Sequence, residues 1–364
     1  MDLIKDIKIS KFKNKLELGN SYILRTNLKR PTPGFFSTYT KSIKDITKLI
    51  GSSSVNPPKE SSMTLLKIVG NKFKARKVIK KCRLEEARGF YIEGDNLFLN
   101  EENCVKKINL SNEIIEKFKH PFFKSLHTIK SFDEKSFIIS STGYDTILIV
   151  DKENFKTKYK WTAWENGYNK SPNDTFVYLK GQEITKEETT FIINPKNPKI
   201  KLANANQTTH LNSAVKFFDE DRILSSFFHQ GQIVLIDIKT NKVTVIFKDL
   251  GNPHGCEINS NNSEFYFTDT CKGIFYICDK DTFKVKHKVD LICNGVELKD
   301  RKQWIQDVIL LKEDLFVAID NKENRLIFFS LKNKAKLIKH FDKKTSVNTI
   351  KMIDKNQYDK LCNL

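Results

Sequence analysis

The segment from His210 to Phe247 reads HLNSAVKFFDEDRILSSFFHQGQIVLIDIKTNKVTVIF, and it contains four short apolar runs separated by polar turns. The predicted strands cover residues 210–217, 223–228, 233–237 and 243–247. They are rich in β-branched and aromatic side chains, which is typical of strands bounded by clusters of Asp, Asn, Gly and Lys. Four consecutive antiparallel strands in one unit predict one blade of a β-propeller.

Further copies of the same pattern occur along the chain. They begin near Arg88, at His127, at His254 and at Gln306–Asp307. Most copies lie about 40 to 50 residues apart, which is the spacing of four-stranded propeller repeats. The interval between His127 and His210 is longer, so it holds either two blades or one blade with an insertion. Strand-like runs at 176–179 and 189–193 favour a degenerate blade there. The sequence therefore predicts an all-β fold, a β-propeller with six or seven four-stranded antiparallel blades.

The repeat also decides the domain organisation. A chain of 364 residues is long enough for more than one domain, but blades arranged round one axis form a single unit. We therefore expect residues 1–364 to be one propeller domain, with 1–60 as an irregular N-terminal segment that helps to close the ring. The runs 21–26 and 347–353 are the segments expected to complete the closure. The runs 63–69 and 75–79 are expected to be outer strands of an early blade.

Composition limits the function classes. The formal net charge is +19, and the excess comes mainly from Lys residues spread through the predicted turns. Such lysines are typical of solvated blade edges, so we expect no specific nucleic-acid binding. The chain shows no long apolar run and no secretory leader, which predicts a cytoplasmic protein without membrane attachment. Seven scattered cysteines without CxxC spacing indicate reduced, buried thiols. Phosphate-binding loops and the HExxH and GxSxG motifs are absent from the sequence.

Three histidines lead copies of the repeat. If His127, His210 and His254 share one phase, a radial fold brings them to one mouth of the central channel. Three neutral imidazoles suit a divalent transition metal that would polarise a substrate or acidify a water molecule. Alternatively, one histidine acts as a nucleophile or general base while Arg88 holds an anionic group. A structural alternative is that each histidine hydrogen-bonds a neighbouring blade.

Other residues are expected to contact a ligand at the same mouth. Asp307, or its neighbour Gln306, occupies the leading phase in its own copy. Glu257 lies one pleat deeper than His254, and Asn212 follows His210. Trp161, Trp164 and Glu165 belong to a loop that we expect to overhang the channel and stack on a planar or sugar-like molecule. The alternative for this loop is an aromatic plug packed between two blades.

As a pattern, the chain resembles the six-bladed enzyme propellers, including the arylsulfotransferase type and the gluconolactonase and strictosidine-synthase type. His127, followed by Asp133 and the run 138–141, is similar to the way in which arylsulfotransferase-like blades present pore histidines. That likeness implies a histidine at the centre of group transfer, with Arg88 as the anion holder. The gluconolactonase type holds its metal with carboxylates and amides, whereas this phase is rich in His, so its calcium chemistry is not expected here.

Two functions remain open from the sequence. The first is a propeller enzyme that uses the three histidines, with a divalent metal, for hydrolysis or group transfer on a small, anionic molecule in the central channel. The second is a non-catalytic propeller that acts as a scaffold for a ligand or a protein. Metal analysis of the purified protein distinguishes the two hypotheses.

Overall fold

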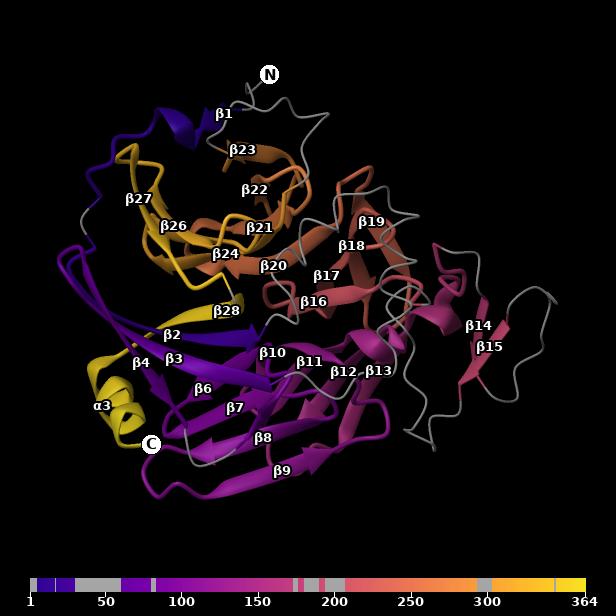
Figure 1. The fold of residues 1–364 in the computed structure, drawn as a ribbon. Coiled ribbons are helices and arrows are strands. Elements are labelled where there is room, and N and C mark those ends of the chain that lie inside the picture. The colour runs from indigo at the N-terminus through magenta and orange to yellow at the C-terminus, as the bar shows by residue number, and fades with distance from the viewer. Residues whose placement is uncertain are drawn as a thin grey trace.

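The computed structural model describes residues 5–16, 18–29, 60–79, 83–172, 176–179, 190–193, 207–292, 303–343 and 345–364. Within these ranges, six sheets of four or five strands lie round a central axis (Figure 1). The predicted all-β propeller is confirmed, and the ring has six blades.

Five blades each use four consecutive strands, with the first strand innermost. The first blade contains β6 (Phe90–Glu93), β7 (Asn96–Asn100), β8 (Cys104–Asn109) and β9 (Ile115–Lys119). The second contains β10 (Leu126–Asp133), β11 (Ser136–Ser141), β12 (Thr146–Asp151) and β13 (Thr157–Thr162). The third contains β16 (Leu211–Lys216), β17 (Arg222–Phe227), β18 (Gln232–Asp237) and β19 (Val243–Phe247). The fourth contains β20 (Pro253–Asn259), β21 (Glu264–Asp269), β22 (Ile274–Asp279) and β23 (Val285–Asp290). The fifth contains β24 (Ile305–Lys312), β25 (Leu315–Asp320), β26 (Arg325–Ser330) and β27 (Ala335–His340).

The sixth blade joins the two ends of the chain. Its innermost strand is the C-terminal β28 (Thr345–Ile353), and its outer strands are β2 (Asn20–Lys29), β3 (Glu60–Val69) and β4 (Lys72–Val78), with β5 (Leu84–Glu85) beside β3. Ile23 of β2 pairs with Met352 on one side and with Leu66 on the other. In Figure 1 the yellow β28 lies next to the indigo β2. The predicted closure by the runs 21–26 and 347–353 is confirmed.

The first described residues cover the outer edges of two blades. The strand β1 (Lys5–Lys8) pairs in parallel with β23, and Lys13 forms a bridge with Ala335 at the start of β27. The ammonium of Lys336 donates to the carbonyl of Ile9 at 2.9 Å. This segment therefore occupies strand edges that would otherwise be open to intermolecular pairing.

The interval between the second and third blades is an insertion, so the predicted degenerate blade is wrong. The second blade ends with β13, and the third begins with β16. The described residues between them include β14 (Phe176–Leu179) and β15 (Thr190–Ile193), which pair in parallel as a separate two-stranded sheet. A blade needs antiparallel neighbours joined by tight turns, and parallel pairing requires a longer connection. The strand-like runs were recognised in the sequence, but their direction was not.

The helical elements of the described residues are short. They are the 3₁₀ turns η1 (Ile9–Lys11), η2 (Thr142–Tyr144), η3 (Ala163–Asn166) and η5 (Ser260–Asn262), and the helix α3 (Lys355–Asn363). Asp354 caps α3 by accepting from the backbone N–H of Gln357, whose side chain reaches back to Asp354. The cysteines of the described residues are free; Cys104, Cys256 and Cys278 are buried, and Cys271 and Cys362 are half-buried. Cys82 and Cys293 lie outside these residues.

A β-bulge recurs near the start of the innermost strands. In β10, Leu126 pairs with Ser141, yet Ile129 is opposite Ile139, so the register shifts between them. The same irregularity occurs near the starts of β16, β20 and β24. A bulge re-aims the side chains next to it. These bulges therefore act on the residues that border the central channel.

Candidate functional site

One face of the ring carries most of the candidate residues. The innermost strands start at this face, and the loops between the second and third strands of each blade end there as well. We call this face the mouth. Residues from four blades lie at this face, namely Arg88, Glu102, Lys124, His127, Asp145, Gln207, His210, His229 and His254.

The register shows that the three predicted histidines are not in one phase. Leu126, Leu211 and Pro253 are equivalent, since each is the first paired residue of its innermost strand. His127 and His254 follow this position, whereas His210 precedes it. The predicted common phase is therefore wrong by two residues for His210, and Asn212 is the true equivalent of His127.

His210 instead occupies the turn before the strand. Its φ is +47°, and Ser125 and Asn252, which hold the equivalent position, have φ values of +48° and +63°. The left-handed region costs free energy for residues other than glycine, although Asn, Asp and His enter it more readily than most. The side chain of His210 is thus carried by a loop, and something must hold that loop in place.

Asp145 holds it. This carboxylate is fully buried and accepts three backbone N–H groups, from Thr208 at 2.6 Å, Thr209 at 3.2 Å and His210 at 2.7 Å. It also accepts the hydroxyls of Thr209 at 2.8 Å and Thr208 at 3.3 Å. Burial raises the pKa of Asp145, and the hydrogen bonds from the three residues oppose that rise. The sequence analysis did not single out Asp145, so this support was missed.

The described imidazoles at the mouth lie close together. The ring centroids of His127 and His210 are 5.8 Å apart, and those of His210 and His229 are 5.1 Å apart in a stacked arrangement. Phe228 packs on one side against His210 at 5.0 Å and on the other against His254 at 4.9 Å. His254 is buried and its Nδ1 lies 2.8 Å from the Thr270 hydroxyl. His254 is therefore a packed residue behind Phe228, while the other three rings are half-buried.

Gln207 fixes the protonation of two of these rings. Its side-chain oxygen contacts Nδ1 of His210, and its backbone carbonyl is 2.8 Å from Nδ1 of His229. Because both oxygens are acceptors, both Nδ1 atoms carry the proton and the Nε2 atoms are left as bases. His127 has no hydrogen-bond partner among the described residues. No sequence pattern distinguished His229, which does not lead a copy of the repeat.

All four imidazoles are neutral near pH 7. Burial lowers the pKa of His127 well below its ordinary value, and Arg88 and His254 lower it further. Burial also lowers the pKa of His210, with His229, His127, His254 and Arg88 as further causes. The pKa falls to about 4 for His229 and to about 3 for His254, in both cases mainly through burial. Neutral imidazoles beside a guanidinium can accept protons or bind an electrophile.

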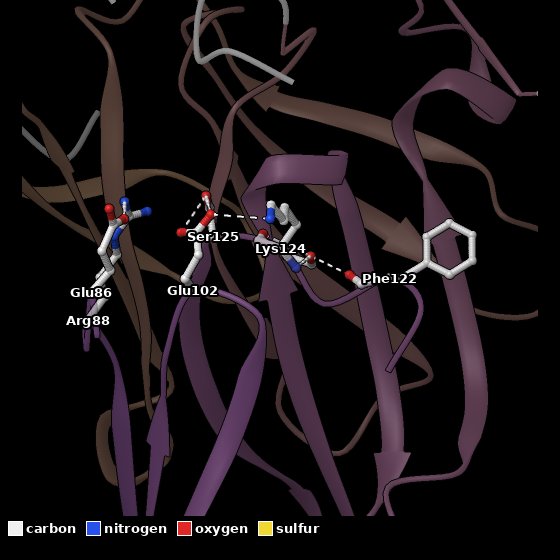
Figure 2. Close-up of polar contacts among 7 residues, drawn as sticks. Glu86, Arg88, Glu102, Phe122, Lys124 and Ser125 are labelled. Carbon is white, nitrogen blue, oxygen red and sulfur yellow. Dashed lines mark hydrogen bonds and ion pairs between the residues drawn. The ribbon is translucent and has the colours of Figure 1, made fainter. Parts of the chain in front are cut away.

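Arg88 and its neighbours form the charged side of the mouth (Figure 2). The Arg88 guanidinium pairs with Glu86 at 3.0 Å, and both side chains are largely buried. Glu102 accepts from the Ser125 hydroxyl at 3.0 Å and lies 3.8 Å from the ammonium of Lys124. The backbone N–H of Ser125 also donates to the carbonyl of Glu102 at 2.6 Å. Glu102 therefore ties the first blade to the turn that leads into His127.

A glycine allows His127 to approach the first blade. A Cβ built on Gly89 would lie 2.2 Å from the backbone oxygen of His127. No larger residue fits without moving one of the two strands. Gly89 thus sets the distance between the Arg88 segment and His127.

The described residues do not provide the three ligands that the predicted metal would need. Within the described ranges, no group of three His, Cys, Asp or Glu side chains is arranged to hold a metal ion. Phe228 separates His254 from His210, and a hydroxyl occupies Nδ1 of His254. This geometry supports no chemistry through a metal, and the divalent metal stays a prediction of the sequence.

The loop around Trp161 lies away from the channel. Trp161 is 1% exposed and Trp164 is 4% exposed, and both belong to the hydrophobic cluster between the second and third blades. Trp161 stacks on Phe227 with ring centroids 5.5 Å apart. Glu165 pairs with Lys160 at 3.3 Å. The expected loop that overhangs the channel is therefore wrong, because the indole rings have no surface left for a ligand. The contacts correspond instead to the alternative, an aromatic plug packed between two blades.

The remaining predicted contacts lie in the channel wall. Asn212 is buried, accepts from the Ser226 hydroxyl at 2.7 Å and reaches the carbonyl of Pro253. Asn212 therefore ties the third blade to the fourth rather than facing a ligand. Glu257 pairs with Lys130 at 2.7 Å, and Asp307 is half-buried beside Gly255. These last two belong to a deeper level of the channel than the histidines.

Comparisons with known proteins support the fold. No family model and no curated protein matches the chain. Among solved structures, a nidogen/laminin complex is similar with a TM-score of 0.54 at 10% identity, over 91% of this chain and 98% of that chain. A streptogramin B lyase is similar with a TM-score of 0.47 at 7% identity, over 88% of each chain. Virginiamycin B lyase from Staphylococcus aureus is similar with a TM-score of 0.45 at 9% identity, over 70% of each chain. At these identities the likeness is one of fold. No helix among the described residues is long and apolar enough to cross a membrane.

Proposed function

We propose that this propeller is an enzyme that binds a small anionic molecule at the mouth and catalyses hydrolysis or group transfer with a neutral histidine as general base. The observation that carries the proposal is the 5.8 Å contact between the rings of His127 and His210 beside Arg88. Two half-buried neutral imidazoles next to a fixed cation are the components of acid–base catalysis on an anion.

Arg88 is the proposed anion holder. Its guanidinium is held by Glu86 and offers further N–H donors in a planar fork, which suits carboxylate, phosphate or sulfate oxygens. Lys124 adds a second positive charge on the same side, although Glu102 partly balances it. The anion would therefore be positioned between the first and second blades.

His127 and His210 are the proposed proton acceptors. His127 has both ring nitrogens available within the described residues, and Gln207 leaves His210 with a basic Nε2. In hydrolysis or transfer to a hydroxyl, the imidazole would take the proton of the attacking water or alcohol and return it to the leaving group. Stacked against His210, His229 would support the orientation of that ring.

The test is turnover of a panel of 4-nitrophenyl esters, namely the acetate, phosphate and sulfate, at neutral pH. With a general base removed, His127→Ala and His210→Ala should lower kcat/KM by about 100-fold or more. Arg88→Gln should raise KM for the charged esters and leave the acetate little changed. His340→Ala is the matched control because His340 is exposed on the outermost strand of the fifth blade.

The opposite outcome is equally clear. If the wild type turns over none of the esters and sulfate or phosphate raises the melting temperature of wild type and Arg88→Gln equally, the enzyme hypothesis fails and the scaffold hypothesis gains. Metal analysis of protein purified without an affinity tag belongs to the same experiment. Stoichiometric metal that is lost in His127→Ala would restore the metal version of the reaction.

A further inference from the structure

A second group of charged residues lies at one level inside the channel. Lys130, Glu257 and Lys351 each lie just past the β-bulge of their innermost strand. Lys130 and Lys351 lie four residues after Leu126 and Val347, the paired residues that precede the bulge, and Glu257 lies three residues after His254, which precedes the bulge in β20. They come from the second, fourth and sixth blades. We call Lys130, Glu257 and Lys351 the channel triad.

The triad position faces the lumen. The ammonium of Lys130 is 2.7 Å from the Glu257 carboxylate and 2.7 Å from the carbonyl of Cys256. The second and fourth blades are separated by the third, so this ion pair can form only across the channel. Lys351 has the same position relative to the bulge in the sixth blade, so its side chain faces the same lumen. The charges of Glu257 and Lys130 both affect its pKa.

Lys351 is the unpaired member. Its ammonium lies over the ring of Tyr91 on the first blade, 4.7 Å from the ring centroid. No carboxylate of the described residues is within ion-pairing distance of it, whereas Lys130 has Glu257. Burial lowers the pKa of Lys351 to about 8, with Lys130 lowering it further and Glu257 opposing the change. A half-buried lysine beside another cation is the usual setting of a nucleophilic amine.

Asp307 is a second acidic group of the channel wall. It lies on β24, the innermost strand next to β28, and its register position is two residues closer to the mouth than that of Lys351. A Cβ on Gly255 would lie 2.0 Å from Oδ1 of Asp307, so the carboxyl group occupies space that only a glycine leaves open. Burial, and then the charge of Glu257, raise the pKa of Asp307 to about 7. At neutral pH a large fraction of this carboxyl group is protonated.

We propose that Lys351 is a reactive amine that forms a Schiff base with the aldehyde or ketone group of a small molecule entering the channel, with Asp307 as the proton donor. The ε-amine adds to the carbonyl carbon to give a carbinolamine. Asp307 then donates a proton to the carbinolamine hydroxyl, which leaves as water while the nitrogen lone pair forms the C=N bond. The carbonyl oxygen departs in that water, and no oxidant or reductant is consumed.

The proposal is tested by trapping with glyoxylate, a small anionic aldehyde, and sodium cyanoborohydride, which reduces the imine to a stable secondary amine. Peptide mass mapping at neutral pH then gives the rate of modification at each lysine. Lys351 should be modified at least about tenfold faster than the exposed Lys332, because its lower pKa leaves more free amine. Equal rates at the two lysines would overturn the proposal.

Three variants keep the test specific. Lys351→Arg preserves the positive charge and should abolish the fast adduct without moving label to Lys130. Asp307→Asn should slow the adduct at Lys351 while the rate at Lys332 stays unchanged; an unchanged rate at Lys351 would remove Asp307 from the mechanism. His127→Ala should leave the trapping intact, so failure of the mouth proposal and failure of this one are distinguishable.

Discussion

Removal of the Asp145 carboxylate should detach the loop that carries His210. In Asp145→Ala, three backbone N–H groups, of Thr208, Thr209 and His210, lose their acceptor in a fully buried environment. The two threonine hydroxyls lose theirs too, but a hydroxyl can rotate to another partner. The backbone N–H groups cannot.

The expected magnitude follows from these contacts. A buried donor without a partner costs about 1–3 kcal/mol, and relaxation that admits water brings the total toward the lower end. Three such donors give a loss of roughly 3–5 kcal/mol in the free energy of unfolding for Asp145→Ala. Asp145→Asn keeps one acceptor oxygen for Thr209 and His210 but turns an NH₂ toward the Thr208 N–H, so it should lose about 1–3 kcal/mol.

Urea unfolding measures the loss of unfolding free energy, and amide hydrogen exchange measures local opening of the loop. Asp237→Ala is the control, since Asp237 accepts from the N–H and hydroxyl of Thr240 at an exposed turn and should cost about 1 kcal/mol or less. If the loop opens locally before the blades unfold, faster exchange at residues 207–212 will report it even where the unfolding midpoint changes little.

The reasoning is refuted if Asp145→Ala unfolds within about 0.5 kcal/mol of the wild type and exchange at residues 207–212 is also unchanged. The three donors would then have found other partners at no cost. A loss of stability without a loss of ester turnover would refute only the link from Asp145 to the function of His210.

Three further outcomes are expected. Gly255→Ala should destabilise the protein by more than about 2 kcal/mol in urea unfolding, because its Cβ would meet Asp307. Gly70→Ala is the control: Gly70 has a similar positive φ but open space around it, so this variant should cost about 1 kcal/mol. The folded-state pKa of His254 is lowered from 6.5 to about 3, so the stability that it contributes is present above pH 6.5 and is lost as the pH falls toward 3. His254→Asn should therefore flatten the dependence of unfolding free energy on pH in this range. An unchanged slope would contradict the lowered pKa of His254. Binding to unrelated DNA should be weak and should disappear with moderate salt in a filter or anisotropy assay, and tight binding at physiological salt would show that the lysines form a phosphate-binding surface.

The strands could be predicted from the sequence because equivalent strands in every blade have the same burial pattern. A middle strand such as β12, with residues Thr146–Asp151, is buried on both faces between neighbouring blades, so it appears as a continuous apolar run. The direction of pairing in the insertion could not be predicted in this way, since β14 and β15 have the composition of strands in either arrangement. The position of Trp161 could not be predicted either. A tryptophan that stacks on a ligand and one that packs between two blades cannot be told apart by residue type.

The sequence predicted that histidines gather at the mouth but placed His210 wrongly. The reason is the turn before each innermost strand. Ser125, His210 and Asn252 share a left-handed backbone there, but the loops that lead into them differ in length, so the sequence aligned His210 with His127 two residues out of place. A shift of two residues within a regular strand would leave a side chain on the same face of the sheet. His210 lies outside the strand, on the turn, where Asp145 rather than the strand register fixes its position. The imidazoles of His127 and His210 therefore meet through a hydrogen-bonded loop from one blade and a strand from the next, which makes Asp145 and Gln207 as important to the proposed chemistry as the histidines themselves.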